Sequence, residues 1–210
     1  MTTMTDTYRA SMAHGRIRAR WTDGESCGDS FEANNMMSYS AADILAAAYG
    51  GDTSKVPKYI GFIYGPESEN PLPPITRDMD WKYVRQMTKD LEGNIQVARF
   101  SRKPSIDVSE VVDSNDQPLY RGNVVEFHAV TRSNVDGEYG MDTSGDSRFA
   151  GKLHSGDTMY RAVLLGDGIP CDDDEKYTVL AMVDLSKDGK TYRKKPDSYE
   201  LAIDWRVTFE

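Results

Sequence analysis

The residue types that most often carry catalysis or metal binding are spread thinly along the chain. The three histidines, His14, His128 and His154, share no short spacing, and the two cysteines, Cys27 and Cys171, lie far apart. A zinc site needs His and Cys ligands at short, repeated intervals. We therefore predict no metal site, and we interpret both cysteines as free thiols rather than as a pair.

The densest acidic run is Asp172–Glu175, between Pro170 and an apolar segment that begins at Tyr177. A calcium loop places acids at alternate positions with a glycine between them, and this run has neither feature. The pattern favours a solvated turn between two strands, with weak binding of a divalent cation as the alternative.

Three Gly-Asp-Ser/Thr motifs, at residues 28–30, 145–147 and 156–158, offer a hydroxyl group as a nucleophile. A catalytic serine would occupy a strand-to-helix elbow with a base and an acid nearby. None of the motifs has that context, and Gly-Asp favours turns, so we interpret all three as turns. The glycine patterns that cradle phosphates are absent as well. The sequence therefore predicts no catalytic residue and no cofactor.

One basic cluster, Lys187–Lys195, stands out against a formal net charge of −9. Asp188-Gly189 inside it is a hairpin-turn signal, so we predict a charged hairpin tip, with an anion site as the alternative. A positive patch on an acidic protein suits docking to an acidic neighbour, including another copy of the chain.

Hydrophobic periodicity predicts the elements that would position these residues. Arg16–Trp21 alternates as a half-buried strand does, and Thr22–Asp29 after it is turn-like in composition. Ser40–Tyr49 predicts a helix with Ser40 as N-cap and Asp43 completing a capping box. A second short helix is predicted over Asp80–Leu91.

The rest of the chain is typical of β structure. His128 falls in one of the predicted strands, opposite the face that carries Phe127, and we interpret it as a partly exposed strand residue rather than a ligand. The further strand predictions are Tyr59–Tyr64, Ile95–Phe100, Val124–Thr131, Met159–Leu165, Tyr177–Leu185 and Tyr199–Phe209. The core residues predicted from these patterns are Ile17, Trp21, Ile60, Phe62, Val97, Phe127, Leu164, Leu180, Val183, Ile203, Trp205 and Val207.

The sequence predicts a mainly β protein: an antiparallel β-sandwich with one or two short helices and an extended N-terminal arm. We place the arm at residues 1–15 and a single domain at 16–210, with a long loop at 132–157. The length of 210 residues suffices for one sizeable core.

Charge and hydropathy exclude several function classes. With 25 Lys and Arg against 34 Asp and Glu, the chain does not supply the positive surface that direct nucleic-acid binding needs. It has no apolar run long enough for a membrane helix. We expect no secretory signal either, because Met1–Arg20 contains no apolar stretch of that kind.

The hydrophobic motifs, strongest in the last fifty residues, resemble a family of tailed-bacteriophage virion proteins found in tail fibres, baseplates or necks. Asn70–Leu91 and Arg132–Asp157 are longer than the corresponding segments of that family. The matching segments are Gly15–Ile17, Trp21–Gly24, Ser40–Gly50, Tyr59–Phe62 with Gly65, Thr158–Leu165, Val179–Ala181, Lys195–Pro196 and Leu201–Phe209.

This resemblance implies a non-enzymatic structural protein of the virion, present in multiple symmetric copies at the tail, baseplate or neck. Its partners would be copies of itself and other virion proteins. Tyrosines and methionines outside the predicted strands could form the interfaces. These candidate interface residues are Met1, Met4, Tyr8, Met12, Tyr139 and Tyr192.

Three alternatives remain open at this point. The protein could decorate the capsid surface as a cement protein. It could bind a host receptor or surface glycan, with Trp81, Tyr139 and Asp142 stacking on or contacting sugar rings. It could also be a hydrolase that uses Asp146 or Ser147, which has the least support.

Overall fold

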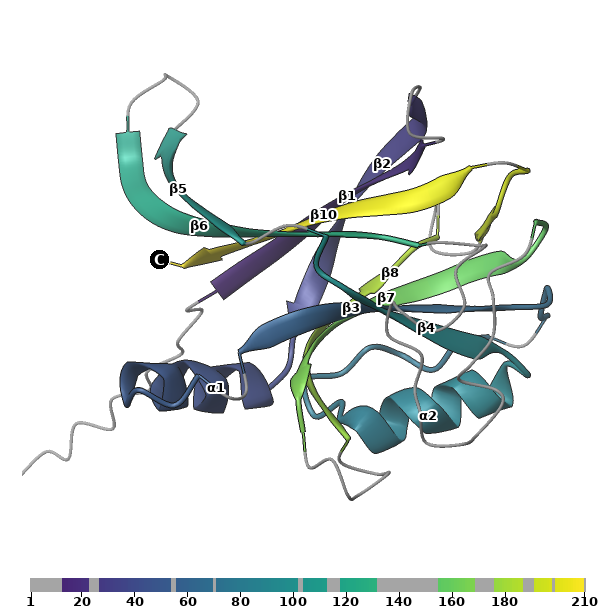
Figure 1. Ribbon diagram of the computed structural model, residues 1–210, viewed down its shortest axis with the longest axis horizontal. Coiled ribbons are helices and arrows are strands. Elements are labelled where there is room, and N and C mark those ends of the chain that lie inside the picture. The colour runs from purple at the N-terminus through teal and green to yellow at the C-terminus, as the bar shows by residue number, and fades with distance from the viewer. Residues whose placement is uncertain are drawn as a thin grey trace, which may run out of the picture.

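The structure is a computed structural model, and its description covers residues 13–22, 27–53, 56–69, 71–101, 104–112, 118–131, 155–168, 176–186, 191–197 and 199–209. Strands dominate these residues, and two helices accompany them (Figure 1). The helices are α1 (Ser40–Tyr49) and α2 (Trp81–Asp90). The strands are β1 (Ala13–Thr22), β2 (Cys27–Met37), β3 (Pro57–Gly65), β4 (Asn94–Arg99), β5 (Ser105–Val112), β6 (Pro118–Val130), β7 (Thr158–Asp167), β8 (Tyr177–Asp184), β9 (Arg193–Lys194) and β10 (Glu200–Phe209).

All strand pairs are antiparallel, and they join in one path, β4-β3-β7-β8-β2-β1-β10-β6-β5, with β9 beside β7. Only two residue pairs, Met36 with Met182 and Met37 with Ala181, connect β2 to β8. At the other seam, the backbone N–H of Ser101 after β4 donates to the carbonyl of His128 in β6 at 2.9 Å. The sheet is therefore nearly closed and barrel-like (Figure 1), and the predicted two-sheet sandwich is not confirmed.

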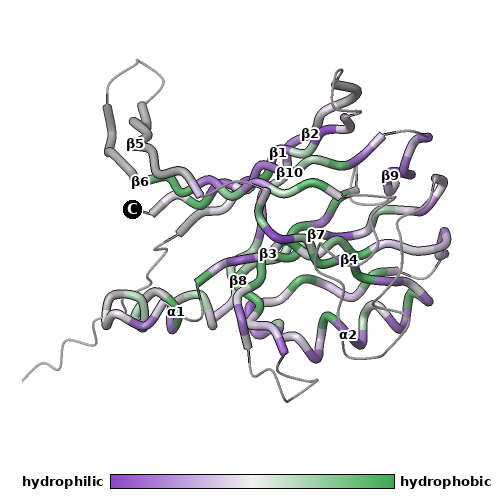
Figure 2. Tube along the Cα trace, viewed as in Figure 1, coloured by the Kyte–Doolittle hydropathy of each residue, from purple (hydrophilic) through white to green (hydrophobic). Residues whose placement is uncertain are grey.

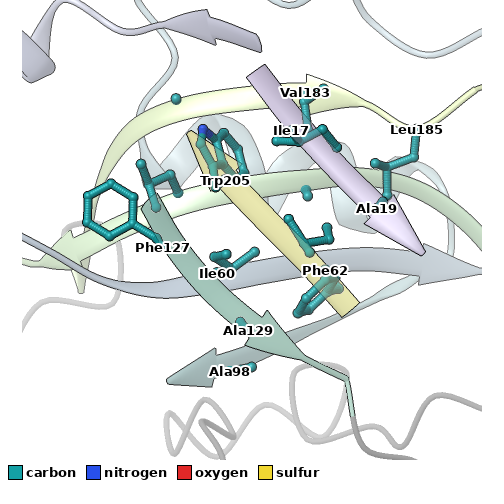
Figure 3. Packing of buried hydrophobic residues seen from close by; sticks show 14 of the residues in the cluster. Ile17, Ala19, Ile60, Phe62, Ala98, Phe127, Ala129, Val183, Leu185 and Trp205 are labelled. Carbon is teal, nitrogen blue, oxygen red and sulfur yellow. The ribbon is translucent and has the colours of Figure 1, made fainter. Parts of the chain in front are cut away.

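The inside of the curled sheet is filled by rows of side chains that cross the strands. Ala33, Ile17, Trp205 and Phe127 are register partners across β2, β1, β10 and β6. Ile17, Trp205 and Phe127 belong to one core cluster with Ile60 and Phe62 of β3 (Figure 3), and Ala33 packs against it. All twelve core residues predicted from the sequence are buried.

A second core cluster lies under α2. Along α2, hydrophobic and hydrophilic residues alternate (Figure 2), and Trp81, Val84 and Met87 face inward. They pack against Ile95 of β4 and Met182 of β8, among others. The strands of this half of the sheet are consequently buried on both faces, as in the uninterrupted buried pattern of Thr158–Gly166 in β7.

The ends of the helices follow two different rules. Asp80 caps α2, because its Oδ1 accepts a hydrogen bond from the backbone N–H of Tyr83 at 2.7 Å. The prediction of Ser40 as N-cap of α1 is wrong: the cap position is Tyr39, and it makes no side-chain capping bond. Tertiary hydrogen bonds hold this junction instead, since the hydroxyl of Ser38 donates to the carbonyl of Val179 at 2.6 Å.

The predicted strands and helices are confirmed, but three strands were not foreseen and one turn was wrongly placed. β2 begins at Cys27, so the Gly-Asp-Ser motif at residues 28–30 lies in a strand. Its pattern is weak because Ser30, Glu32 and Asn34 are exposed, and Phe31, Ala33 and Met37, which pack against the core, are only partly buried. β5 and β9 were also missed. β1 starts at Ala13, so residues 13–15 belong to the strand rather than to the arm.

Candidate functional site

An apolar pocket of about 250 Å³ lies between α1 and one end of the curled sheet. Helix α1 supplies Ala41, Ile44 and Ala48 as one wall. Figure 1 shows α1 lying across the end of the sheet at which β3 begins. The other lining residues are Met37, Val56, Pro57, Pro104, Val125, Phe127, Leu164, Leu180 and Val207.

Local sequence explains why this space is not filled. The face that α1 turns to the sheet carries two alanines beside Ile44, and their short side chains cannot reach the strands opposite. Pro57 is the first residue of β3, and Pro104 immediately precedes β5. A residue without an N–H is tolerated at the start of a strand. The result is a hollow that is lined by apolar residues.

The mouth of the pocket is accessible. Pro104 is exposed, and Ala48 and Val56 are half-buried, whereas Leu164 and Leu180 at the bottom are buried. Such a site suits an apolar side chain or an apolar small molecule, because it buries hydrophobic surface and orients nothing by charge.

The first strand starts beside this pocket. Ala13 pairs with Phe209 at the end of β10, and Gly15 pairs with Val207, which lines the pocket. Gly15 has room only for a hydrogen at its Cα, because a Cβ there would overlap the side-chain amide of Asn35. The polypeptide therefore enters the sheet within two residues of a pocket wall.

The second feature is a charged outer face on β2, β1, β10 and β6. Glu32, Arg18, Asp204 and His128 are register partners in one row across these strands. His128 Nδ1 lies 2.5 Å from Asp204 Oδ1, and Arg20 Nη1 lies 3.7 Å from Asp204 Oδ2. Opposite charges on facing residues stabilise such a row.

A second row beside the first joins Arg16, Arg206 and Glu126. Arg206 Nε donates to Glu126 Oε2 at 2.7 Å, and this hydrogen bond raises the pKa of the Arg206 guanidinium above its ordinary value. Arg16 and Arg206 face each other directly, and Arg16 is drawn to Glu32 on its other side. Arginine side chains therefore cover much of this face of an otherwise acidic protein.

The pair of His128 and Asp204 resembles part of a hydrolytic triad, in which a carboxylate orients an imidazole. The hydroxyl of Ser101 does not complete it, because Ser101 Oγ donates to the backbone carbonyl of His128 at 3.2 Å and not to its ring. His128 is half-buried in β6, as predicted. We interpret the pair as a cross-strand contact of the sheet.

The structure describes few of the predicted site residues. Tyr192 is half-buried, its ring packs edge-on against Tyr160 with centroids 5.1 Å apart, and its hydroxyl donates to Asp184 at 3.1 Å. The suggestion that Trp81 stacks on sugars is wrong, because Trp81 is 1% exposed, on the inward face of α2. Outside the described residues lie Met1, Met4, Tyr8, Met12, Tyr139, Asp142, Asp146, Ser147, His154, Cys171 and Asp172–Glu175.

Sequence reasoning missed both features of this site. The pocket draws its walls from seven helices and strands that are spread along the chain, so no local pattern signals it. The charged rows were visible only as the alternation of Arg16, Arg18 and Arg20 with apolar residues; their partners depend on which strands pair.

Within the described ranges, no group of three or more His, Cys, Asp or Glu side chains could hold a metal ion. The same residues include no helix with the length and apolar character needed to cross a bilayer. Comparison with protein-family models, with curated proteins and with solved structures gives no match to this chain.

Proposed function

We propose that this protein is a non-enzymatic structural component of a tailed-phage particle, present in multiple copies at the tail, baseplate or neck. In this role it joins its neighbours by burying apolar chain segments in preformed hollows. The observation that carries the proposal is the apolar pocket under α1, which opens beside the start of β1. The assignment to a phage particle rests on the sequence motifs, which resemble those of phage virion proteins.

The two cores support a scaffold role. The inside of the sheet and the layer under α2 bury large side chains such as Trp205 and Trp81. A rigid body of this kind holds docking surfaces at fixed positions, as repeated contacts in a symmetric particle require. The rows of alternating charge on the outer face add a polar surface that can select among neighbours by charge complementarity.

A purified preparation of the phage particles tests this proposal. Particles would be banded on a density gradient, dissociated into capsids and tails, and each fraction quantified by mass spectrometry against labelled peptides of this chain. We expect several copies per particle, in a fixed ratio to a known tail component, in the tail fraction. Enrichment in the capsid fraction would favour a capsid-decorating role instead. Absence of the chain from banded particles, when it is abundant in the lysate, would refute the structural role.

Binding of a host glycan is the weaker alternative. It would now depend on Tyr139 and Asp142, because Trp81 is buried. Binding to a glycan array that is lost on substitution of Tyr139 would favour it over an assembly role.

A further inference from the structure

We propose that the apolar pocket under α1 is the docking site for the N-terminal segment, residues 1–12, of a neighbouring copy of the chain. The inference rests on the proposed multi-copy role and names the contact that would join two copies. It follows from the lining of the pocket, from the composition of the segment and from the point at which the segment leaves the sheet.

The pocket has the size and the lining for apolar side chains. A cavity of roughly 150 Å³ lined by aliphatic residues accepts a molecule as large as benzene, and this pocket measures about 250 Å³. One or two side chains of the size of methionine or tyrosine would fit. Phe127, Leu164 and Leu180 would surround them with hydrophobic surface.

The segment carries such side chains at intervals of three and four residues. Met1, Met4, Tyr8 and Met12 are its large apolar residues. Methionine is flexible and fills irregular apolar spaces well. The charges of Asp6 and Arg9 cancel, so the segment brings no net side-chain charge to an apolar site.

The way in which the chain leaves the sheet favours a neighbour over the same copy. β1 starts at Ala13 opposite Phe209, and the preceding residues continue from this point. Residues 8–12, Tyr-Arg-Ala-Ser-Met, contain no Gly, Pro, Asn or Asp, and Ser11 is the one residue among them of a type that favours tight reversals. Twelve residues can span at most about 40 Å when extended, which is enough to reach an adjacent subunit.

Photo-crosslinking of the full-length protein tests this docking. A benzophenone amino acid would replace Tyr8, and unlabelled and isotopically labelled chains would be mixed at high concentration before illumination. We expect crosslinks from position 8 to residues of α1 or to Val56 and Pro57, in peptides that combine labelled and unlabelled chains. Crosslinks only within one chain would overturn the role of a neighbour. Crosslinks only to other surfaces, or none, would overturn the pocket as the site.

Matched variants separate docking from folding. Ala48→Glu places a carboxylate at the mouth of the pocket, whereas Ala46→Glu makes the same change at an exposed position of the same helix. We expect the first to reduce mixed crosslinks at least tenfold and the second to leave them within twofold. Met4→Asp and Thr3→Asp make the same comparison within the segment, where they cannot disturb the folded sheet. Equal effects of Met4→Asp and Thr3→Asp would contradict the proposal.

Failure of this inference and failure of the proposed function are distinguishable. Copies of the chain in tail fractions, together with crosslinks that avoid the pocket, would retain the structural role and discard the docking site. Mixed crosslinks in the pocket of a protein that is absent from particles would support the contact between copies and contradict the role in the virion.

Discussion

Arg161 and Asp184 face each other as register partners on β7 and β8, with Arg161 Nε 3.8 Å from Asp184 Oδ2. The arginine is 2% exposed, beneath the segment that precedes α2. Its Nη1 donates to the sulfur of Met87 at 2.8 Å, and its Nη2 donates to the carbonyl of Pro73. One buried cation thus holds strand, helix and loop together.

We expect the two simplest substitutions of Arg161 to differ in their effect. Arg161→Ala should lower the free energy of unfolding by about 2–4 kcal/mol, because it empties buried space and leaves the Pro73 carbonyl without this donor. Arg161→Met should cost less than the alanine variant, because methionine refills much of the buried volume, although it too leaves Asp184 and the Pro73 carbonyl without this partner. Urea denaturation measures both values. Equal losses in the two variants would show that the charge, not the volume, matters.

Limited proteolysis adds a local readout at the same residue. The carbonyl of Pro74 is held by the hydroxyl of Tyr83 at 2.6 Å, and that of Pro66 by the hydroxyl of Tyr160. We therefore expect Arg161→Met to increase cleavage near Pro73. The hydrogen bonds from Tyr83 and Tyr160 should still protect the chain near Pro74 and Pro66. Tyr83→Phe is the matched control, because it frees a neighbouring carbonyl at the surface.

Trp205 is the residue whose truncation should be most costly inside the sheet. It is completely buried between its register partners Ile17 and Phe127. We expect Trp205→Ala to lower the free energy of unfolding by about 3–5 kcal/mol. Trp205→Phe should cost less, because a ring remains and the indole N–H makes no hydrogen bond in the structure. A loss below about 1 kcal/mol for the alanine variant would contradict the assigned packing.

Removal of residues 1–12 should separate assembly from stability. The shortened protein keeps every residue pair between β1 and β10, which begin at Ala13 and Phe209. We expect its melting temperature to stay within about 2 °C of the full chain, with loss of self-association in sedimentation velocity. Removal of residues 1–16 is the control, because it also deletes strand pairs and should lower the melting temperature clearly. Normal association of the shorter deletion would argue against an N-terminal contact.

Alkaline pH should destabilise the protein through its buried tyrosines. Burial, followed by the charge of Asp184, raises the pKa of Tyr192, and burial raises the pKa of Tyr64 and of Tyr160. A raised pKa in the folded state means that the unfolded chain loses these protons first. Stability is therefore complete below the ordinary tyrosine pKa of about 10 and falls as pH rises above it.

Absorbance of tyrosinate measures this effect. Part of the absorbance change of the 12 tyrosines should appear only above the pH at which the urea-unfolded chain titrates. Tyr192→Phe should remove one such delayed step, because the pKa of Tyr192 is raised in the folded protein. A single titration near pH 10 for all tyrosines would contradict the buried assignments.

The sequence was informative wherever burial is one-sided and local. Ile17 and Trp21 alternate with Arg16 and Arg18, so the face and period of β1 could be predicted. The helix at Ser40–Tyr49 follows from its alanines and from the glycines after it. Its cap could not be predicted, because Ser38 bonds to Val179, far away in the chain.

Closure of the sheet and the position of the pocket were beyond local reasoning. An alternating pattern states which side of a strand is buried but not which strand lies beside it. A two-sheet sandwich and a curled single sheet consequently share one pattern, and the contact between Ser101 and His128 distinguishes them. The pocket depends on the same closure, because Val125 and Val207 meet α1 only when the sheet curls.

The pairing of β1 with β10 has a consequence for synthesis of the protein. Residues at nearly opposite ends of the sequence, such as Ala13 and Phe209, must find each other before the sheet can curl. Until β10 has been translated, β1 can pair only with β2, and β6 can pair only with β5. Proteins dominated by such distant contacts fold slowly, and their open edges recruit other chains in the meantime. Prematurely terminated chains that lack β10 should therefore aggregate, and closure of the sheet should begin only after β10 has been synthesised.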